Sequence, residues 1–435
     1  MVDALRHHEA VLQRQHAAYK GQATGLAYFR AFQTLDIPSR RILTSPMARS
    51  VKSPWNTVPA DMMVLWTAWP THCLHGRENC CEEFSSEVLN VEPDGALSKG
   101  RLALRRRYFP FASGHASTQP GFVVWTNSTS SRLGCEHPGA EVLFLGLLDP
   151  RGQLASDQLV KVDLRVTASA FVSDVKMFEF LGSTYLVVAH SFNKYLLPSS
   201  KGGHIDIYLL APGQAHWQLH QTLNATGVAS IDVVEFDGIV FLSSANSWKQ
   251  GLTSTYSTVY TLSGAVNMFV PMADVPTSLA SSTLFLTVDN SLLCAFASEK
   301  TGLQDQHSWL DAHTEPVSIY RHMYGRFQLL QNIPMPGVNA MEHFRFAGDA
   351  FLVLGSRHLQ TVAIYQWKGY SKFEQVQAIS VSPVALKSYW SRTGSLFLSV
   401  ATECGKTRVF EALPYGRCIS PRDQVGHSSS HTRAI

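Results

Sequence analysis

Short apolar runs recur along most of the chain, separated by stretches rich in Gly, Pro, Ser and Asn. Continuous apolar character over so few residues indicates a β-strand that is covered on both faces. The seven runs are MVLWTAW (63–69), FVVWTN (122–127), TYLVVAH (184–190), IVFLSSAN (239–246), TLFLTV (283–288), AFLVLGS (350–356) and SLFLSVA (395–401). Beyond its first twenty or so residues, the chain therefore predicts an all-β protein.

A second kind of segment, rich in Phe, Gln and Leu, alternates with these runs, and between the two kinds lies room for two more strands. These segments are 28–39, 216–227, 325–337 and 371–383, with weaker versions at 101–113, 159–169 and 267–278. The apolar runs recur about every fifty residues, which suits a four-stranded unit. Such units bury their faces only by stacking on one another. Seven of them predict a seven-bladed β-propeller.

The two ends of this pattern predict how the ring closes. The first Phe/Gln strand, near 28–36, has no unit of its own, whereas the last unit runs out of strands after Leu413. Pairing the surplus strand with the incomplete unit removes exposed edges. We therefore expect a propeller over 26–414, preceded by a helical or disordered extension (1–25) and followed by a disordered tail (415–435).

Four stretches share a local pattern in which an aromatic or apolar residue comes four positions before a Gly, and an apolar strand follows. They are FEFLGSTYLVVA (178–189), VEFDGIVFLSSAN (234–246), FRFAGDAFLVLG (344–355) and WSRTGSLFLSVA (390–401). This pattern resembles the EAR repeat, also called the EPTP repeat. The EAR/EPTP family includes the leucine-rich glioma-inactivated proteins and the protein with a thrombospondin-type laminin G domain and EAR repeats. The resemblance implies a seven-bladed propeller that binds other proteins outside the cell.

Charge and sequons bear on the partner and the compartment. The chain has 36 Lys and Arg against 33 Asp and Glu, a balance that gives no reason to propose a nucleic acid as partner. No apolar run is long enough to span a bilayer. Asn127 and Asn224 begin glycosylation sequons. Residues 1–21 lack the apolar core of a secretory signal, so a secreted protein would require a further N-terminal part.

Four cysteines fall in insertions of the first two units: Cys73, Cys80, Cys81 and Cys135. We expect them to form a disulfide between two neighbouring loops. His72 and His75 lie among the first three, which leaves a zinc site as the alternative. The spacing lacks a Cys-x-x-Cys pair and a second half-site, so the disulfide is the preferred interpretation.

Catalytic signatures are not found: the chain contains no G-x-S-x-G, H-E-x-x-H, P-loop or G-x-G-x-x-G pattern. Asp174, Asp232 and Glu342 stand at the starts of inner strands, where converging carboxylates could hold a structural Ca²⁺ in the channel. The alternative is that these acids accept hydrogen bonds from nearby backbone N–H groups. We assign no catalytic residue and no other cofactor.

Together these observations favour a non-enzymatic propeller that recognises a protein, by resemblance a cell-surface receptor or a matrix component. Two alternatives stay open because a fold alone does not fix function. One is a propeller enzyme with a site at the mouth of the channel, which convergent His and carboxylate groups would support. The other is an intracellular interaction scaffold.

Overall fold

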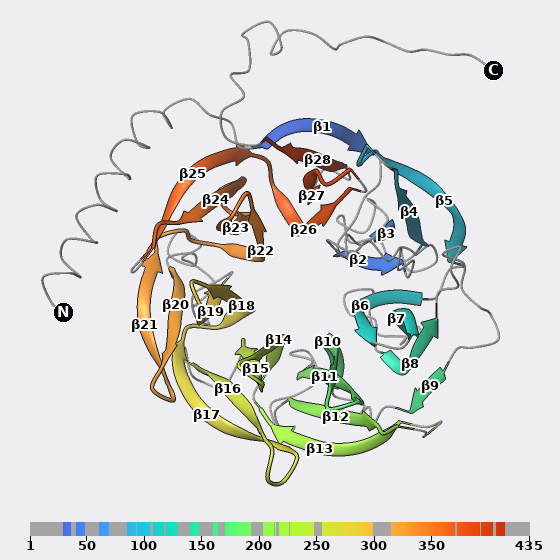
Figure 1. Ribbon diagram of the computed structural model, residues 1–435, viewed down its shortest axis with the longest axis vertical. Helices are drawn as coiled ribbons and strands as arrows, with labels where there is room; N and C mark the ends of the chain where they lie inside the picture. Colours follow the sequence, from blue (N-terminus) through green and yellow to red (C-terminus); the bar gives the residue numbers. More distant parts are fainter. Residues whose placement is uncertain are drawn as a thin grey trace, which may run out of the picture.

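The computed structural model describes a ring of β-sheets around a central channel (Figure 1). It describes residues 29–35, 41–47, 61–68, 85–92, 94–104, 108–116, 119–128, 140–147, 160–163, 170–192, 203–212, 214, 217–225, 227–247, 255–298, 315–369, 372–391, 393–402 and 406–413. Side chains are described for 29–35, 92, 94–97 and most of these residues from 173 onward. The predicted helical extension (1–25), the disordered tail (415–435) and the four candidate cysteines lie outside the described residues.

The described strands form seven four-stranded antiparallel sheets, six of which follow the chain order from the channel outward. The first two sheets comprise β2 (Arg41–Met47), β3 (Asp61–Ala68), β4 (Ser85–Val91), β5 (Leu97–Leu104), β6 (Tyr108–Ala116), β7 (Gln119–Ser128), β8 (Ala140–Leu147) and β9 (Val160–Asp163). The next two comprise β10 (Ala170–Phe180), β11 (Ser183–Phe192), β12 (His204–Leu210), β13 (Gln218–Asn224), β14 (Val228–Phe236), β15 (Ile239–Asn246), β16 (Thr255–Ser263) and β17 (Met268–Thr277). These sheets confirm the predicted all-β architecture.

The remaining sheets complete the ring. Two of them comprise β18 (Ala280–Val288), β19 (Ser291–Ser298), β20 (Val317–Met323), β21 (Arg326–Ile333), β22 (Val338–Phe346), β23 (Asp349–Ser356), β24 (Thr361–Trp367) and β25 (Phe373–Ser380). The last comprises β26 (Pro383–Trp390), β27 (Leu396–Thr402), β28 (Thr407–Ala412) and, as its outermost strand, β1 (Phe29–Leu35). β1 thus joins the sheet made by the C-terminal strands, and Figure 1 shows it at the rim of the ring.

The aligned glycines of the sequence pattern form hairpin turns between the first two strands of their sheets. In the Leu181-Gly182, Asp237-Gly238 and Ala347-Gly348 pairs, both residues have positive φ angles. Two consecutive positive φ angles define the type I′ turn, whose twist matches that of the flanking strands. Gly is favoured there because it adopts this conformation without a steric cost.

The apolar core lies between the sheets rather than at a single centre. Each buried cluster joins two neighbouring sheets; one, for example, combines β22–β25 with β26–β28 and β1. In that cluster the ring of Phe344 meets the ring of Phe29 edge-on at 5.6 Å between centroids. Phe178 likewise stacks on Tyr185 and meets Phe269 of the next sheet edge-on. These pattern aromatics therefore hold adjacent sheets together.

Glutamines on the outermost strands make a repeated contact at the rim. Each Gln amide donates to the carbonyl of one residue on the next outer strand and accepts from the N–H of that same residue. We call this pair of bonds a glutamine clamp. The clamps are Gln221 to Phe269 (2.8 and 2.8 Å), Gln331 to Phe373 (3.0 and 2.7 Å), Gln377 to Phe29 (2.9 and 2.9 Å) and Gln33 to Leu97 (3.0 and 2.9 Å). The clamps explain why Phe and Gln recur together in the outer-strand segments.

Candidate functional site

The inner strands carry charged residues at one repeated position. A β-bulge occurs near the start of β10, β14, β18, β22 and β26, and it gives the five strands a common register. Three residues beyond the bulged residue stand Lys176, Asp232, Leu284, Glu342 and Lys387. The order is a base, an acid, a neutral residue, an acid and a base. Opposite charges therefore face each other at two junctions between sheets.

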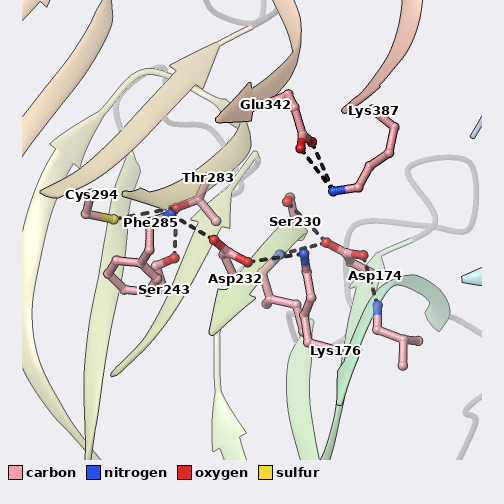
Figure 2. A network of polar contacts seen from close by, with 12 residues as sticks. Asp174, Lys176, Ser230, Asp232, Ser243, Thr283, Phe285, Cys294, Glu342 and Lys387 are labelled. Carbon is pink, nitrogen blue, oxygen red and sulfur yellow. Dashed lines mark hydrogen bonds and ion pairs between the residues drawn. The ribbon is translucent and has the colours of Figure 1, made fainter. Parts of the chain in front are cut away.

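Asp232 is held by the sheets on both sides of it (Figure 2). Its Oδ1 lies 3.2 Å from Nζ of Lys176 on the preceding inner strand, and its Oδ2 accepts a 2.8 Å hydrogen bond from the backbone N–H of Phe285 on the following one. Burial opposes the charge on Lys176, but the carboxylates of Asp232 and Asp174 outweigh it and raise the pKa of Lys176 above its usual range. The base therefore stays protonated at any physiological pH.

Asp174 and Glu342 are also satisfied by protein groups. Asp174 accepts from the N–H of Val175 (2.9 Å), from the N–H of Ile231 (3.0 Å) and from the hydroxyl of Ser230 (3.2 Å). Both carboxylate oxygens of Glu342 lie 3.1 Å from Nζ of Lys387, and Oε1 also accepts from Ser388 at 2.8 Å. Figure 2 shows Glu342 and Lys387 facing each other across one junction.

The three acids proposed for a channel Ca²⁺ site are each held by protein groups: Asp174 and Asp232 at the junction of β10 and β14, and Glu342 at the junction of β22 and β26. Asp174 and Asp232 lie two residues apart in the common register, and each contacts the next inner strand at its own level. Within the described part of the chain, the group of three ligand side chains within reach of one ion includes none of the three acids. What the sequence pattern does not reveal is the pairing of Lys176 and Lys387 with these acids, because it occurs between different sheets.

A small buried network beside Asp232 contains the thiol of Cys294. Thr283 donates to Ser243 at 2.9 Å and lies 3.7 Å from Sγ of Cys294. Burial raises the pKa of Cys294 above its usual range, so the thiol stays protonated. A buried, protonated thiol is a packing group rather than a nucleophile.

One face of the ring carries large apolar residues in its turns. Because neighbouring strands are antiparallel, the described turns after the first and after the third strand of a sheet lie on the same face. That face presents Leu181 (84% exposed) and Tyr324 (94% exposed), each followed by a Gly. Val266 and Ile239 are also exposed there. We call Leu181, Ile239, Val266 and Tyr324 the turn-face patch.

The turn-face patch is not predicted by the sequence pattern, although a signal for it exists. Turn positions with positive φ normally hold Asn, Asp or Gly, yet Leu181 and Tyr324 occupy such positions with φ angles of 49° and 51°. A bulky apolar residue in a strained, solvent-exposed conformation gains nothing from packing within the chain. It is therefore a candidate for contact with a partner.

The structure describes the side chain of Asn224, which begins one sequon, but only the backbone of Asn127, which begins the other. Asn224 is exposed and ends β13, the outermost strand of its sheet. Asn127 lies in β7, where its backbone pairs with Tyr108 and Val142, and its side chain is outside the described residues. No helix among the described residues is long and apolar enough to cross a membrane.

Comparisons with known proteins place this fold. Residues 326–368 match the family model described as EPTP domain. The fold resembles BBS1N in complex with ARL6DN (TM-score 0.51, 10% identity, covering 89% of this chain and 98% of that one). It also resembles Kuenenia stuttgartiensis hydrazine synthase (0.53, 12%, 87% and 96%) and the Dos1 propeller (0.50, 10%, 89% and 96%). No curated protein sequence matches the chain. These likenesses identify a β-propeller and, through residues 326–368, support the EAR/EPTP resemblance.

Proposed function

We propose that this β-propeller, whose residues 326–368 match the EPTP domain, uses its seven sheets as the blades of a closed ring that recognises another protein. The proposal excludes catalysis and places the protein outside the cell, where its partner is a cell-surface receptor or a matrix component. The observation that carries it is the turn-face patch. The match at residues 326–368 includes β21 to β24, directly after Tyr324.

The turn-face patch has the composition of a recognition surface. Tyr and large aliphatic residues supply most of the binding energy where proteins meet, provided that the partner removes them from water. The four patch residues come from three consecutive sheets, so a single partner could cover them together. Among the structural neighbours, BBS1N is itself recorded in complex with a protein, ARL6DN, which is a precedent for this fold.

Within the described inner strands, the charged side chains support a binding role over an enzymatic one. A general acid or base needs a titratable group that is free to exchange a proton with a substrate. Asp232 and Glu342 instead contact Lys176 and Lys387, and Cys294 is buried. These groups stabilise the junctions between sheets.

Binding through the turn-face patch is tested with single substitutions. We would label the purified chain and measure its binding to intact cells and to immobilised matrix proteins. Tyr324→Ser and Leu181→Ser should each weaken binding about tenfold or more, since loss of an interface anchor costs roughly 1–2 kcal/mol or more. The matched controls are Tyr256→Ser and Leu359→Ser, exposed residues at the strand ends and turns of the opposite face. Equal binding by all four variants would contradict the patch.

The extracellular location is tested through Asn224. Expressed from its natural transcript, the protein should carry a glycan that a glycosidase removes and that Asn224→Gln eliminates, measured as an intact-mass difference. An unmodified Asn224 together with unmodified Asn127 would contradict secretion and favour the intracellular scaffold.

A further inference from the structure

Two histidines and an aspartate meet on one face of the β10–β13 sheet, far along the strands from the hairpin turn at Leu181. His190 of β11 and His204 of β12 are direct cross-strand partners, and their rings stack at 4.3 Å between centroids. Asp206 follows His204 by two residues in β12, so its side chain lies on the same face. No part of this trio contacts the acids of the channel network in the described interactions.

The distances within the trio suit a metal ion. Oδ2 of Asp206 lies 3.5 Å from Nε2 of His190 and 3.4 Å from Nε2 of His204. Zinc bonds to nitrogen and oxygen are about 2.0–2.1 Å long, so the edges of a regular tetrahedral site measure about 3.3–3.4 Å. One ligand atom from each residue lies within 4.8 Å of the other two. The two distances from Asp206 therefore match the edges of a tetrahedral site, and the two imidazole atoms lie within 4.8 Å of each other.

The buried atoms that face this space make no close hydrogen bond. Nε2 of His190 and Oδ2 of Asp206 are shielded from solvent, and the polar atoms nearest to Oδ2 on the two imidazoles stay 3.4 and 3.5 Å away. Leaving such groups unpaired costs free energy, so buried polar atoms without partners call for an explanation. A bound cation would satisfy His190 and Asp206 at once.

The surroundings of the trio hold its members in place. The other carboxylate oxygen of Asp206 accepts a 2.6 Å hydrogen bond from Thr222 of the neighbouring strand, which fixes the orientation of the carboxylate as outer partners of metal ligands do. Gly203 precedes His204, and a Cβ there would lie 2.2 Å from the carbonyl oxygen of His190. Only glycine lets β12 begin this close to His190.

One member of the trio is partly open to solvent. His204 is 21% exposed, which gives an ion a route from solvent.

We propose that His190, His204 and Asp206 form a binding site for a divalent transition-metal ion of the Zn²⁺ class. Two imidazole nitrogens and one carboxylate oxygen provide three ligands, and water completes the tetrahedron. Nitrogen donors select Zn²⁺ and its neighbours over Ca²⁺ and Mg²⁺, which prefer oxygen. The ion would join β11 to β12 at the end of their shared ladder.

The test is calorimetric titration of the full chain with Zn²⁺ after chelator treatment and alkylation of accessible thiols. The intact chain should bind one more equivalent of Zn²⁺ than the His204→Ala variant. Zn²⁺ should raise the melting temperature of the intact chain but not that of the variant. Co²⁺ should give the visible absorption bands of a tetrahedral site in the intact chain alone. His220→Ala, at a half-buried histidine of the same sheet outside the trio, is the matched control and should bind like the intact chain.

Graded variants separate a metal site from a purely structural cluster. Thr222→Val should weaken Zn²⁺ binding roughly 10–100-fold, whereas Thr222→Ser should keep it, since only the hydroxyl orients Asp206. Asp206→Asn keeps the shape of the side chain but removes its charge, and this variant should bind one equivalent of Zn²⁺ fewer than the intact chain. Equal Zn²⁺ stoichiometry and affinity in the intact chain and His204→Ala, or no Zn²⁺ binding by the intact chain, would overturn the proposal.

Discussion

The junction between β17 and β21 differs from its neighbours at the rim of the ring. The glutamines of the clamps stand directly after a bulged residue in β1, β13, β21 and β25. The same position in β17 is Ala273. Among the described side chains, no clamp therefore joins β17 to Phe327 of β21. The two sheets nevertheless pack through a shared apolar cluster, to which Met272 and Phe327 contribute.

This difference distinguishes two contributions of the contacts between sheets, apolar burial and directional hydrogen bonding. Apolar burial holds the sheets together at clamped and unclamped junctions alike, because it depends on area rather than direction. A clamp adds directional bonds to one residue of the next outer strand, so it fixes the alignment of the two strands. The closing strand β1 is bound by clamps on both sides, through Phe29 and through Gln33.

The largest effect should follow from Gly95→Ala at the clamped junction beside β1. Gly95 has a φ angle of +92°, and a Cβ there would lie 2.1 Å from the ring of Phe397. Its carbonyl also accepts a buried 3.0 Å hydrogen bond from Tyr389. Strain and overpacking together should cost about 3 kcal/mol or more, measured as a lower midpoint in urea unfolding. Gly264→Ala, where a Cβ would meet nothing, is the control. Equal urea midpoints for Gly95→Ala and Gly264→Ala would contradict the tight packing of Gly95 against Phe397.

Gln377→Ala should have an intermediate effect because it removes one clamp and leaves the backbone of Phe29 without its partner. The loss of two hydrogen bonds should cost about 2 kcal/mol and speed hydrogen exchange of the Phe29 amide. Gln375→Ala, at an exposed position of the same strand, should change neither quantity. Unchanged exchange at Phe29 in Gln377→Ala would mean that the clamp does not hold β1.

The smallest effect, and the one of opposite sign, is expected from Ala273→Gln. Installing the missing glutamine should stabilise the unclamped junction by about 0.5–1 kcal/mol, measured by urea unfolding. Ala273→Glu has the same shape but cannot donate to the carbonyl of Phe327, so it should give no gain. A gain of equal size from both variants would assign the effect to packing rather than to the clamp.

Local features of this fold follow from the sequence, whereas contacts between sheets do not. The apolar runs and the glycines at 182, 238 and 348 indicate strands and hairpin turns because both depend on neighbouring residues. The Phe-x-x-x-Gln spacing of Phe373 and Gln377 is also visible in the sequence. Its meaning requires the next sheet, where Phe29 lies 348 residues away along the chain.

The candidate sites show the same limit. Asp232 can be placed on an inner strand from its position before a Gly, but Lys176, 56 residues earlier, is identified as its partner only by the register between sheets. His190 and His204 look scattered in a chain with 18 histidines. Their approach depends on the ladder between β11 and β12, which sequence periodicity does not specify.

The position of β1 in the sheet of β26–β28 also sets the order of events during synthesis. Chains emerge from the ribosome N-terminus first, so β1 leaves the ribosome before every other strand of its sheet. Its partner β28 ends at Ala412, so β1 cannot form this pairing until the chain has been translated through Ala412. Ring closure through β1 therefore cannot precede the synthesis of β28, and a chain that stops before Thr407 has a propeller with an open edge.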